Sequence, residues 1–166
     1  MKYSVFDAHC DTLCAVLDRG KSIKKNDCHI DLTRMNEYEK YTQVFACFIA
    51  PEYRHCAAQR CFDLIDVFKY SKINGILSIE GGECIESAEI LREFYEEGVR
   101  IAALTWNNTN RLAAGADEKD VKKGLTHFGK KIVREMNKLG MIVDVSHLND
   151  KSFYEVWEMS EKPIIA

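Results

Sequence analysis

The sequence predicts an α/β protein in which parallel strands alternate with helices. Short apolar runs alternate with longer segments of helical periodicity, and no hairpin turn joins one run to the next. The apolar runs are nearly continuous, which is typical of strands in a sheet that is covered on both faces. At about 150 residues per domain, a chain of 166 residues is expected to form a single domain over residues 1–166.

Six apolar runs are the expected strands. They comprise residues 3–6, 43–49, 76–79, 99–104, 141–145 and a sixth that begins at 163–166. Each expected strand is thus separated from the next by enough residues for a crossover connection, as parallel pairing requires.

Helices are expected between these runs. A short helix is predicted over 11–18, and apolar residues within 61–68 recur at the i, i+3, i+4, i+7 spacing of one helix face. Residues 90–94 mark a further helix, and 126–139 carries a continuous apolar stripe. The expected boundary residues are Thr126 and Asn149 as N-caps and Gly98 and Gly140 as C-terminal ends. The polar stretch 106–123 is long for a βα connection, which makes it a candidate functional loop.

Composition excludes several classes of protein. Lys and Arg number 23 and Asp and Glu 26, so the net charge of −3 argues against nucleic-acid binding by bulk phosphate attraction. The segment 21–31, with Lys24 and Lys25, is interpreted as a solvated loop. No run approaches the ~18 apolar residues that a membrane span needs. The N-terminus turns polar too early for a secretory signal, so a cytoplasmic protein without a membrane partner is expected.

The seven cysteines do not suggest a disulfide framework or a thiolate zinc site. Their number is odd, and none forms a C-x-x-C pair. Cys47 lies inside an apolar run and is expected to be a small core residue. Reduced thiols are expected, as in a reducing compartment.

The first candidate for chemistry is the pair His9 and Asp11, where the first expected strand ends. Two residues apart on extended backbone, their side chains point the same way. An imidazole and a carboxylate projected together form half of a site for zinc or a similar cation. An H-x-D motif alone also fits an ordinary surface or core position, but parallel barrels place catalysis at this end of a strand.

Two further strand ends carry metal-ligand side chains. Glu80 ends the third run before two glycines, where a carboxylate has the reach to bridge two cations; a solvated turn is the alternative. His147 ends the fifth run. The coincidence of three such strand ends on one rim is the argument for a site. Asp144 is expected to be a supporting or buried hydrogen-bonded acid, and Glu83 is expected to be exposed. The remaining histidines, His29, His55 and His127, receive no role.

Other catalytic signatures are absent from the sequence. It contains no G-x-S-x-G, Walker or G-x-G-x-x-G motif. A Cys10–His9 dyad is geometrically poor, because neighbouring strand residues point to opposite faces.

Several segments together resemble the membrane dipeptidase (renal dipeptidase) family of zinc peptidases, within the amidohydrolase-like barrels. The similar segments are 7–11 (Asp-Ala-His-Cys-Asp), 79–82 (Ile-Glu-Gly-Gly), 104–107 (Leu-Thr-Trp-Asn), 124–129 and 135–147. The resemblance runs along nearly the whole chain, and the last segment is long and specific.

The resemblance implies a hydrolase of the metalloprotease class with a (β/α)8 TIM barrel and two zinc ions. His9 and Asp11 would hold the first ion, His147 the second, and Glu80 would bridge them as the catalytic carboxylate. A hydroxide between the ions would attack the carbonyl of a dipeptide substrate. Renal-type members carry a histidine at the position of Trp106, so Trp106 is expected to affect substrate binding.

The chain differs from the family in length. A barrel of this kind takes roughly 250 residues, and the family pattern would continue with a Ser-His, an Arg and an Asp. Only about the first five to six βα units are therefore expected, as an incomplete barrel corresponding to the N-terminal part of a dipeptidase. Three ligands of the first zinc site are present, but only two of the second.

Two other functions remain open. One is a different amidohydrolase-type reaction on the same metals, such as deacylation or lactone opening. The other is a truncated, non-catalytic binding protein. An open sheet exposes its edge strands, so association into a homo-oligomer, or with the missing C-terminal part, is expected.

Overall fold

The computed structural model describes residues 3–166, and six parallel strands form one sheet in the order β1-β2-β3-β4-β5-β6. Neighbours in the sheet are also neighbours in the chain, so every connection is a crossover of the same kind. This is the arrangement of an incomplete (β/α)8 barrel, as predicted. The strands are β1 (Ser4–Cys10), β2 (Lys40–Phe48), β3 (Ile76–Glu80), β4 (Val99–Ala103), β5 (Ile142–Asp144) and β6 (Ile164–Ile165).

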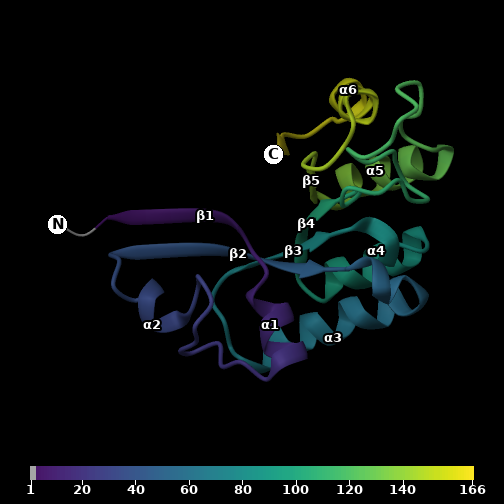
Figure 1. Ribbon diagram of the computed structural model, residues 1–166. Helices are drawn as coiled ribbons and strands as arrows, with labels where there is room; N and C mark the ends of the chain where they lie inside the picture. Colours follow the sequence, from purple (N-terminus) through teal and green to yellow (C-terminus); the bar gives the residue numbers. More distant parts are fainter. Residues whose placement is uncertain (1–2) are drawn as a thin grey trace.

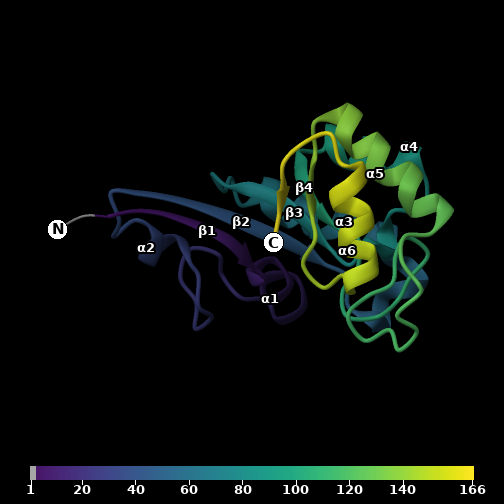
Figure 2. The same cartoon turned by 90° about the horizontal axis from the view of Figure 1, so that it is seen from above.

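Helices cover the convex face of this sheet (Figures 1 and 2). They are α1 (Thr12–Arg19), α2 (Leu32–Met35), α3 (Ala57–Tyr70), α4 (Ala88–Glu96), α5 (His127–Leu139) and α6 (Asp150–Met159), with 3₁₀ turns η1 (Pro51–Cys56) and η2 (Gly82–Cys84). Among the described residues, no helix has the length and apolar character needed to cross a bilayer.

The core lies between the sheet and these helices. Phe45 from β2, Leu64 from α3, Phe94 from α4 and Ile132 from α5 are all fully buried. Cys47 is also fully buried, which confirms the prediction of a core cysteine, and all seven thiols are free.

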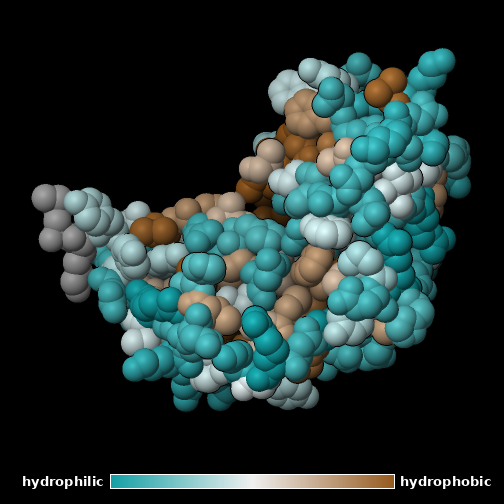
Figure 3. All heavy atoms as spheres, in the orientation of Figure 1, coloured by the Kyte–Doolittle hydropathy of each residue, from teal (hydrophilic) through white to brown (hydrophobic). Residues whose placement is uncertain are grey.

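The opposite face of the sheet is concave and open. The surface is hollowed between the arm of β1 and β2 and the arm of α5 and α6, and hydrophobic surface gathers at the base of the hollow (Figure 3). Phe6 of β1 is 59% exposed. The two edges of the sheet are β1 and β6, as the sequence predicted.

The predicted helix boundaries are confirmed. The Thr126 hydroxyl accepts a hydrogen bond from the Gly129 N–H at 2.9 Å, and Asn149 accepts one from the Ser152 N–H at 2.9 Å. Gly140 ends α5 in the left-handed conformation, at φ +75°. These caps depend on neighbouring residues only, which is why the sequence is sufficient to find them.

The segment 21–31 is only partly the solvated loop that was expected. Lys24 and Lys25 are exposed, but Asp31 is buried and caps α2 by accepting a hydrogen bond from the Arg34 N–H. The Arg34 guanidinium also contacts this carboxylate, and these hydrogen bonds lower the pKa of Asp31 to about 2. The interpretation as a fully solvated loop is therefore wrong at Asp31, because the acid serves as a helix cap.

Candidate metal centre

The carboxyl ends of three strands bring His9, Glu80 and His147 to one edge of the sheet. His9 is the penultimate residue of β1, Glu80 is the last residue of β3, and His147 follows β5 by three residues. Since strands of a parallel barrel all end on the same rim, residues far apart in the chain meet here. The structure thus brings together the side chains that the sequence analysis selected.

Glu80 lies between the two histidines and gives each a different oxygen. Its Oε2 is 3.1 Å from His9 Nε2, and its Oε1 is 3.1 Å from His147 Nε2. The Glu80 side chain is only 10% exposed. One carboxylate oxygen facing each imidazole is the geometry that a bridging ligand requires.

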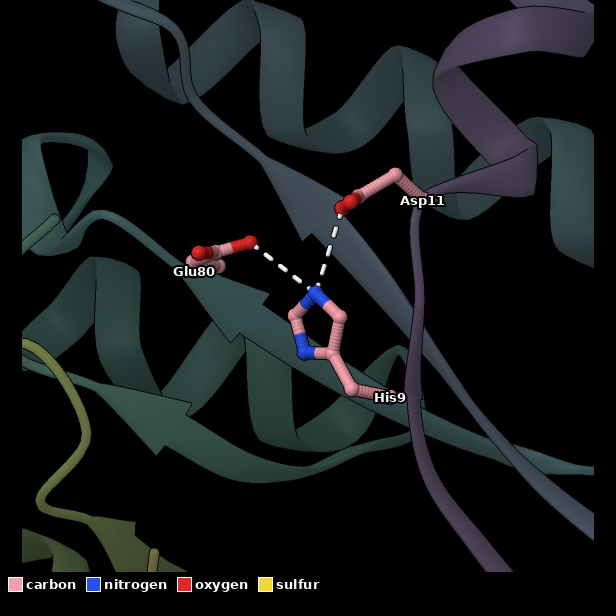
Figure 4. A group of neighbouring side chains, drawn as sticks. All are labelled: His9, Asp11 and Glu80. Carbon is pink, nitrogen blue, oxygen red and sulfur yellow. Dashed lines mark hydrogen bonds and ion pairs between the residues drawn. The ribbon is translucent and has the colours of Figure 1, made fainter.

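Asp11 contacts the same ring nitrogen of His9 as Glu80 does, from a different direction (Figure 4). Its Oδ1 is 3.3 Å from His9 Nε2, and the donor atoms of His9, Asp11 and Glu80 all lie within 4.8 Å of one another. His147 lies outside this group and contacts Glu80.

The reason for this proximity differs from the predicted one. Asp11 does not continue the strand; it is the N-cap residue of α1, with φ −98° and ψ 21°. The pairing of β1 with β2 also shifts register between Asp7 and Cys10. A turn, rather than strand alternation, therefore brings the Asp11 carboxylate to His9.

The two carboxylates change the protonation of His9. Hydrogen bonds with Asp11 and then with Glu80 raise the pKa of His9 to about 10, against the opposing effect of burial. Two acids directed at one imidazole create a local excess of negative charge, which a cation would neutralise in place of the proton.

A cavity of ≈ 210 Å³ opens beside Glu80. Its lining is mainly apolar and includes Ala8, Ala103 and Ile165 together with His9 and His147. Asp144 also lines it, half-buried, with Oδ1 accepting a hydrogen bond from the Ser146 N–H at 2.8 Å. The cavity adjoins both imidazoles.

Glu83 is not exposed, so that prediction is wrong. Its side chain is 11% exposed, and its Oε1 lies 3.5 Å from Arg54 Nε. Gly81, at φ +87°, turns the chain into η2, and the Glu83 carboxylate folds back toward Gly81, where a Cβ would lie 3.1 Å from Glu83 Oε2. The double glycine thus does more than end the strand: it returns the next acid to the protein interior.

Cys10 does not form an activated pair with His9. Burial raises the pKa of the Cys10 thiol to about 11, which disfavours the thiolate. Cys10 lines a second cavity of ≈ 400 Å³ together with His9, Asp11 and His29, the last of which received no role from the sequence.

The sequence analysis missed one residue in contact with the site, Asn107. Its Oδ1 lies 2.8 Å from Nδ1 of His147, the ring nitrogen that faces away from Glu80. Asn107 belongs to the segment 104–107 and begins the long polar connection after β4. The available signal was its place just after a strand end, the same signal that selected the other three residues.

Comparison with known proteins identifies the family. The sequence model of the membrane dipeptidases (Peptidase family M19) matches residues 57–166. The chain belongs to the membrane dipeptidase family. The matched segment includes Glu80 and His147, whereas His9 and Asp11 precede it.

This membrane dipeptidase chain matches two curated relatives over only part of their length. An uncharacterized dipeptidase of Schizosaccharomyces pombe is 36% identical over 159 residues, which is 90% of this chain and 37% of the relative. Dipeptidase 3 of Mus musculus is 38% identical over 100 residues, which is 57% of this chain and 20% of the relative. The chain therefore spans less than two-fifths of the length of each of these relatives.

Solved structures share the fold. A metallopeptidase of family M19, dipeptidase AC, superposes with a TM-score of 0.87 at 23% identity, covering all of this chain and 63% of the other. A Rhodobacter sphaeroides metallopeptidase superposes with a TM-score of 0.82 at 21% identity, covering all of this chain and 65% of the other. The chain thus has the fold of the larger part of a dipeptidase barrel.

Trp106 lies next to the site of this membrane dipeptidase chain. Its ring centroid is 5.6 Å from that of Phe48 and 6.5 Å from that of His147. It flanks the second histidine rather than the floor of the ≈ 210 Å³ cavity. Its predicted effect on substrate binding stays a prediction.

Proposed function

We propose that this chain carries a two-cation hydrolytic centre, with zinc as the cation, that cleaves dipeptides. The observation that supports it most directly is the position of the Glu80 carboxylate, with one oxygen 3.1 Å from each of two imidazole nitrogens. Family membership supports the reaction class.

The spacing of the donor atoms fits the proposed cation. Two ligands at zinc distances of about 2.0–2.1 Å in tetrahedral geometry lie roughly 3.3–3.4 Å apart. The three separations found here, between His9 and Asp11, His9 and Glu80, and His147 and Glu80, are 3.3, 3.1 and 3.1 Å. Mixed imidazole and carboxylate donors are a common ligand set for zinc.

The residues have distinct tasks in this proposal. His9 and Asp11 would hold the first cation, His147 the second, and Glu80 would hold both and set their separation. Paired cations polarise a carbonyl and make water a nucleophile near neutral pH. Ala103 is buried and gives the cavity one apolar wall, which would limit the access of bulk water to a bound substrate.

Dipeptides are the proposed substrates on two grounds. The family is one of dipeptidases, and the related Rhodobacter sphaeroides structure contains a phosphinate mimic of the dipeptide L-Ala-D-Ala. An amidohydrolase from Pseudomonas aeruginosa shares the fold less closely, with a TM-score of 0.62 at 20% identity. Deacylation or lactone opening is therefore the second candidate reaction.

Metal analysis and a substrate panel test this proposal together. We expect the purified chain to bind zinc and to hydrolyse dipeptides, including some with a D-residue in the second position. Dipeptide turnover without action on N-acyl amino acids or lactones supports the dipeptidase; the reverse preference supports the second reaction. Near two zinc ions per chain would support the proposed centre, whereas about one or none would support the non-catalytic alternative.

Zinc affinity should rise with pH. Because the pKa of His9 is about 10 without metal, the ring is protonated at neutral pH and must lose its proton to bind. Affinity should therefore increase by about tenfold per pH unit below that value, from this group alone. Calorimetry in buffers of different ionisation enthalpy should show about one proton released per first ion bound; release of none would contradict the role of His9.

We also propose that the open face is covered in solution. Phe6 shares the inward face of β1 with Ala8, which lines the site, and it is 59% exposed. Unpaired edges at β1 and β6 favour strand pairing with a second copy or with further dipeptidase sequence. Size-exclusion chromatography of the chain alone should show self-association; a stable monomer at all concentrations would exclude the second copy.

A further inference from the structure

We propose that Asn107 is a positioning residue whose side-chain oxygen accepts a hydrogen bond from Nδ1–H of His147 and so turns Nε2 of that ring toward Glu80. The inference rests on the proposed function in one respect: Nε2 is the atom that would bind the second cation. The contact itself, Asn107 Oδ1 to His147 Nδ1 at 2.8 Å, is independent of any metal.

The chemistry of a neutral imidazole explains why this contact matters. Such a ring has one N–H and one lone pair, and only the nitrogen with the lone pair binds a cation. Asn107 presents an oxygen acceptor to Nδ1, and the Glu80 carboxylate faces Nε2 at 3.1 Å, so both nitrogens of the metal-free ring meet acceptors. A cation at Nε2 would replace the proton on that nitrogen, while Asn107 continues to accept the hydrogen bond from Nδ1–H. Oxygen acceptors on the distal nitrogen are the usual means of orienting histidine ligands.

The backbone of His147 is held by the same loop. His147 has φ +64°, a left-handed conformation that residues other than glycine seldom adopt. Its carbonyl oxygen accepts two hydrogen bonds, from the Thr105 hydroxyl at 3.1 Å and from the Ala116 N–H at 2.9 Å. The ring and the backbone are thus fixed from one connection, the segment 105–117.

Asn107 is itself held in place within that segment. Its carbonyl oxygen accepts a hydrogen bond from the Asp117 N–H at 2.9 Å. Gly115 packs so closely that a Cβ there would lie 2.4 Å from the Asn107 carbonyl oxygen. A side chain on a backbone fixed in this way has few alternative positions. Asn107 can therefore hold the His147 ring in one orientation.

The direct test is NMR of the His147 ring N–H groups in the metal-free protein. We expect a slowly exchanging, hydrogen-bonded Nδ1–H in the wild type and in Asn107→Asp, which keeps an oxygen acceptor. In Asn107→Leu, of similar size but without the acceptor, we expect this Nδ1–H signal to be lost to exchange with water. A wild type without a protected Nδ1–H, or a Leu variant identical to wild type, would overturn the proposal.

Zinc titration followed at both rings separates this proposal from the proposed function. In Asn107→Leu we expect zinc affinity at His147 to fall by about 10- to 100-fold, a typical cost of losing such a partner. Affinity at His9 should be unchanged, and Asn107→Asp should restore binding at His147. Equal affinity at His147 in all three proteins would overturn the positioning role. If the wild-type His147 ring never responds to zinc, the two-cation centre fails, and the metal-free spectrum still decides the role of Asn107.

Discussion

Glu80→Gln is expected to abolish the candidate metal centre while leaving the fold intact. The amide keeps the shape of the side chain but carries no charge and cannot give an anionic oxygen to each histidine. Glu80 contacts both His9 and His147, at 3.1 Å each. We therefore expect zinc affinity to fall by at least about 100-fold, more than the loss of a residue that only supports a ligand.

Calorimetric zinc titration measures this effect, with circular dichroism to show that the fold is retained. Glu86→Gln removes the same charge from an exposed position and should bind zinc as the wild type does. His9→Ala and Glu80→Ala should each abolish any hydrolysis found. Undiminished zinc affinity in Glu80→Gln, or turnover in either alanine variant, would refute the assignment of these residues.

Gly129→Ala is expected to cause the largest loss of stability among the glycine substitutions. A Cβ at this position would lie 1.9 Å from the Leu112 carbonyl oxygen, which is backbone and accepts a hydrogen bond from the Thr126 N–H. Because the Leu112 carbonyl is backbone and cannot rotate away, α5 and the loop that contains Leu112 would have to move apart. We expect the free energy of unfolding to fall by about 3 kcal/mol or more, the size of severe overpacking.

Gly140→Ala is the matched control, since it adds the same methyl group at the other end of α5. Nothing lies within 4 Å of a Cβ there, but its φ of +75° disfavours alanine. We expect a cost of about 1 kcal/mol from backbone strain alone. Urea unfolding of both variants gives the comparison; a Gly129→Ala cost no greater than that of Gly140→Ala would show that the contact relaxes.

Local patterns were sufficient for the order of strands and helices. The caps Thr126 and Asn149 and the terminal Gly140 were predicted correctly, because a cap depends on a backbone N–H two or three residues away. The short η1 and α2 were not predicted, because single turns carry too few residues for a periodic pattern.

The candidate site was predicted by a topological argument rather than by a local pattern. Parallel strands end on one rim, so strand ends carrying His9, Glu80 and His147 were expected to meet, and they do. The reasoning for Asp11 was wrong in detail, since a turn and not strand alternation brings it to His9. The prediction that the two side chains lie together was still correct, because the turn brings Asp11 Oδ1 to 3.3 Å from His9 Nε2.

Sequence patterns are therefore sufficient to predict the parallel α/β class, the family and the strand ends that carry ligand-type side chains. Three features could be seen only in the folded chain: Glu80 divides its oxygens between two histidines, Glu83 is folded inward, and Asn107 contacts His147 across forty positions of sequence. The difference lies in the distance along the chain over which each effect acts. Periodicity and caps act over a few residues, whereas side-chain orientation at a strand end depends on the loops packed against it.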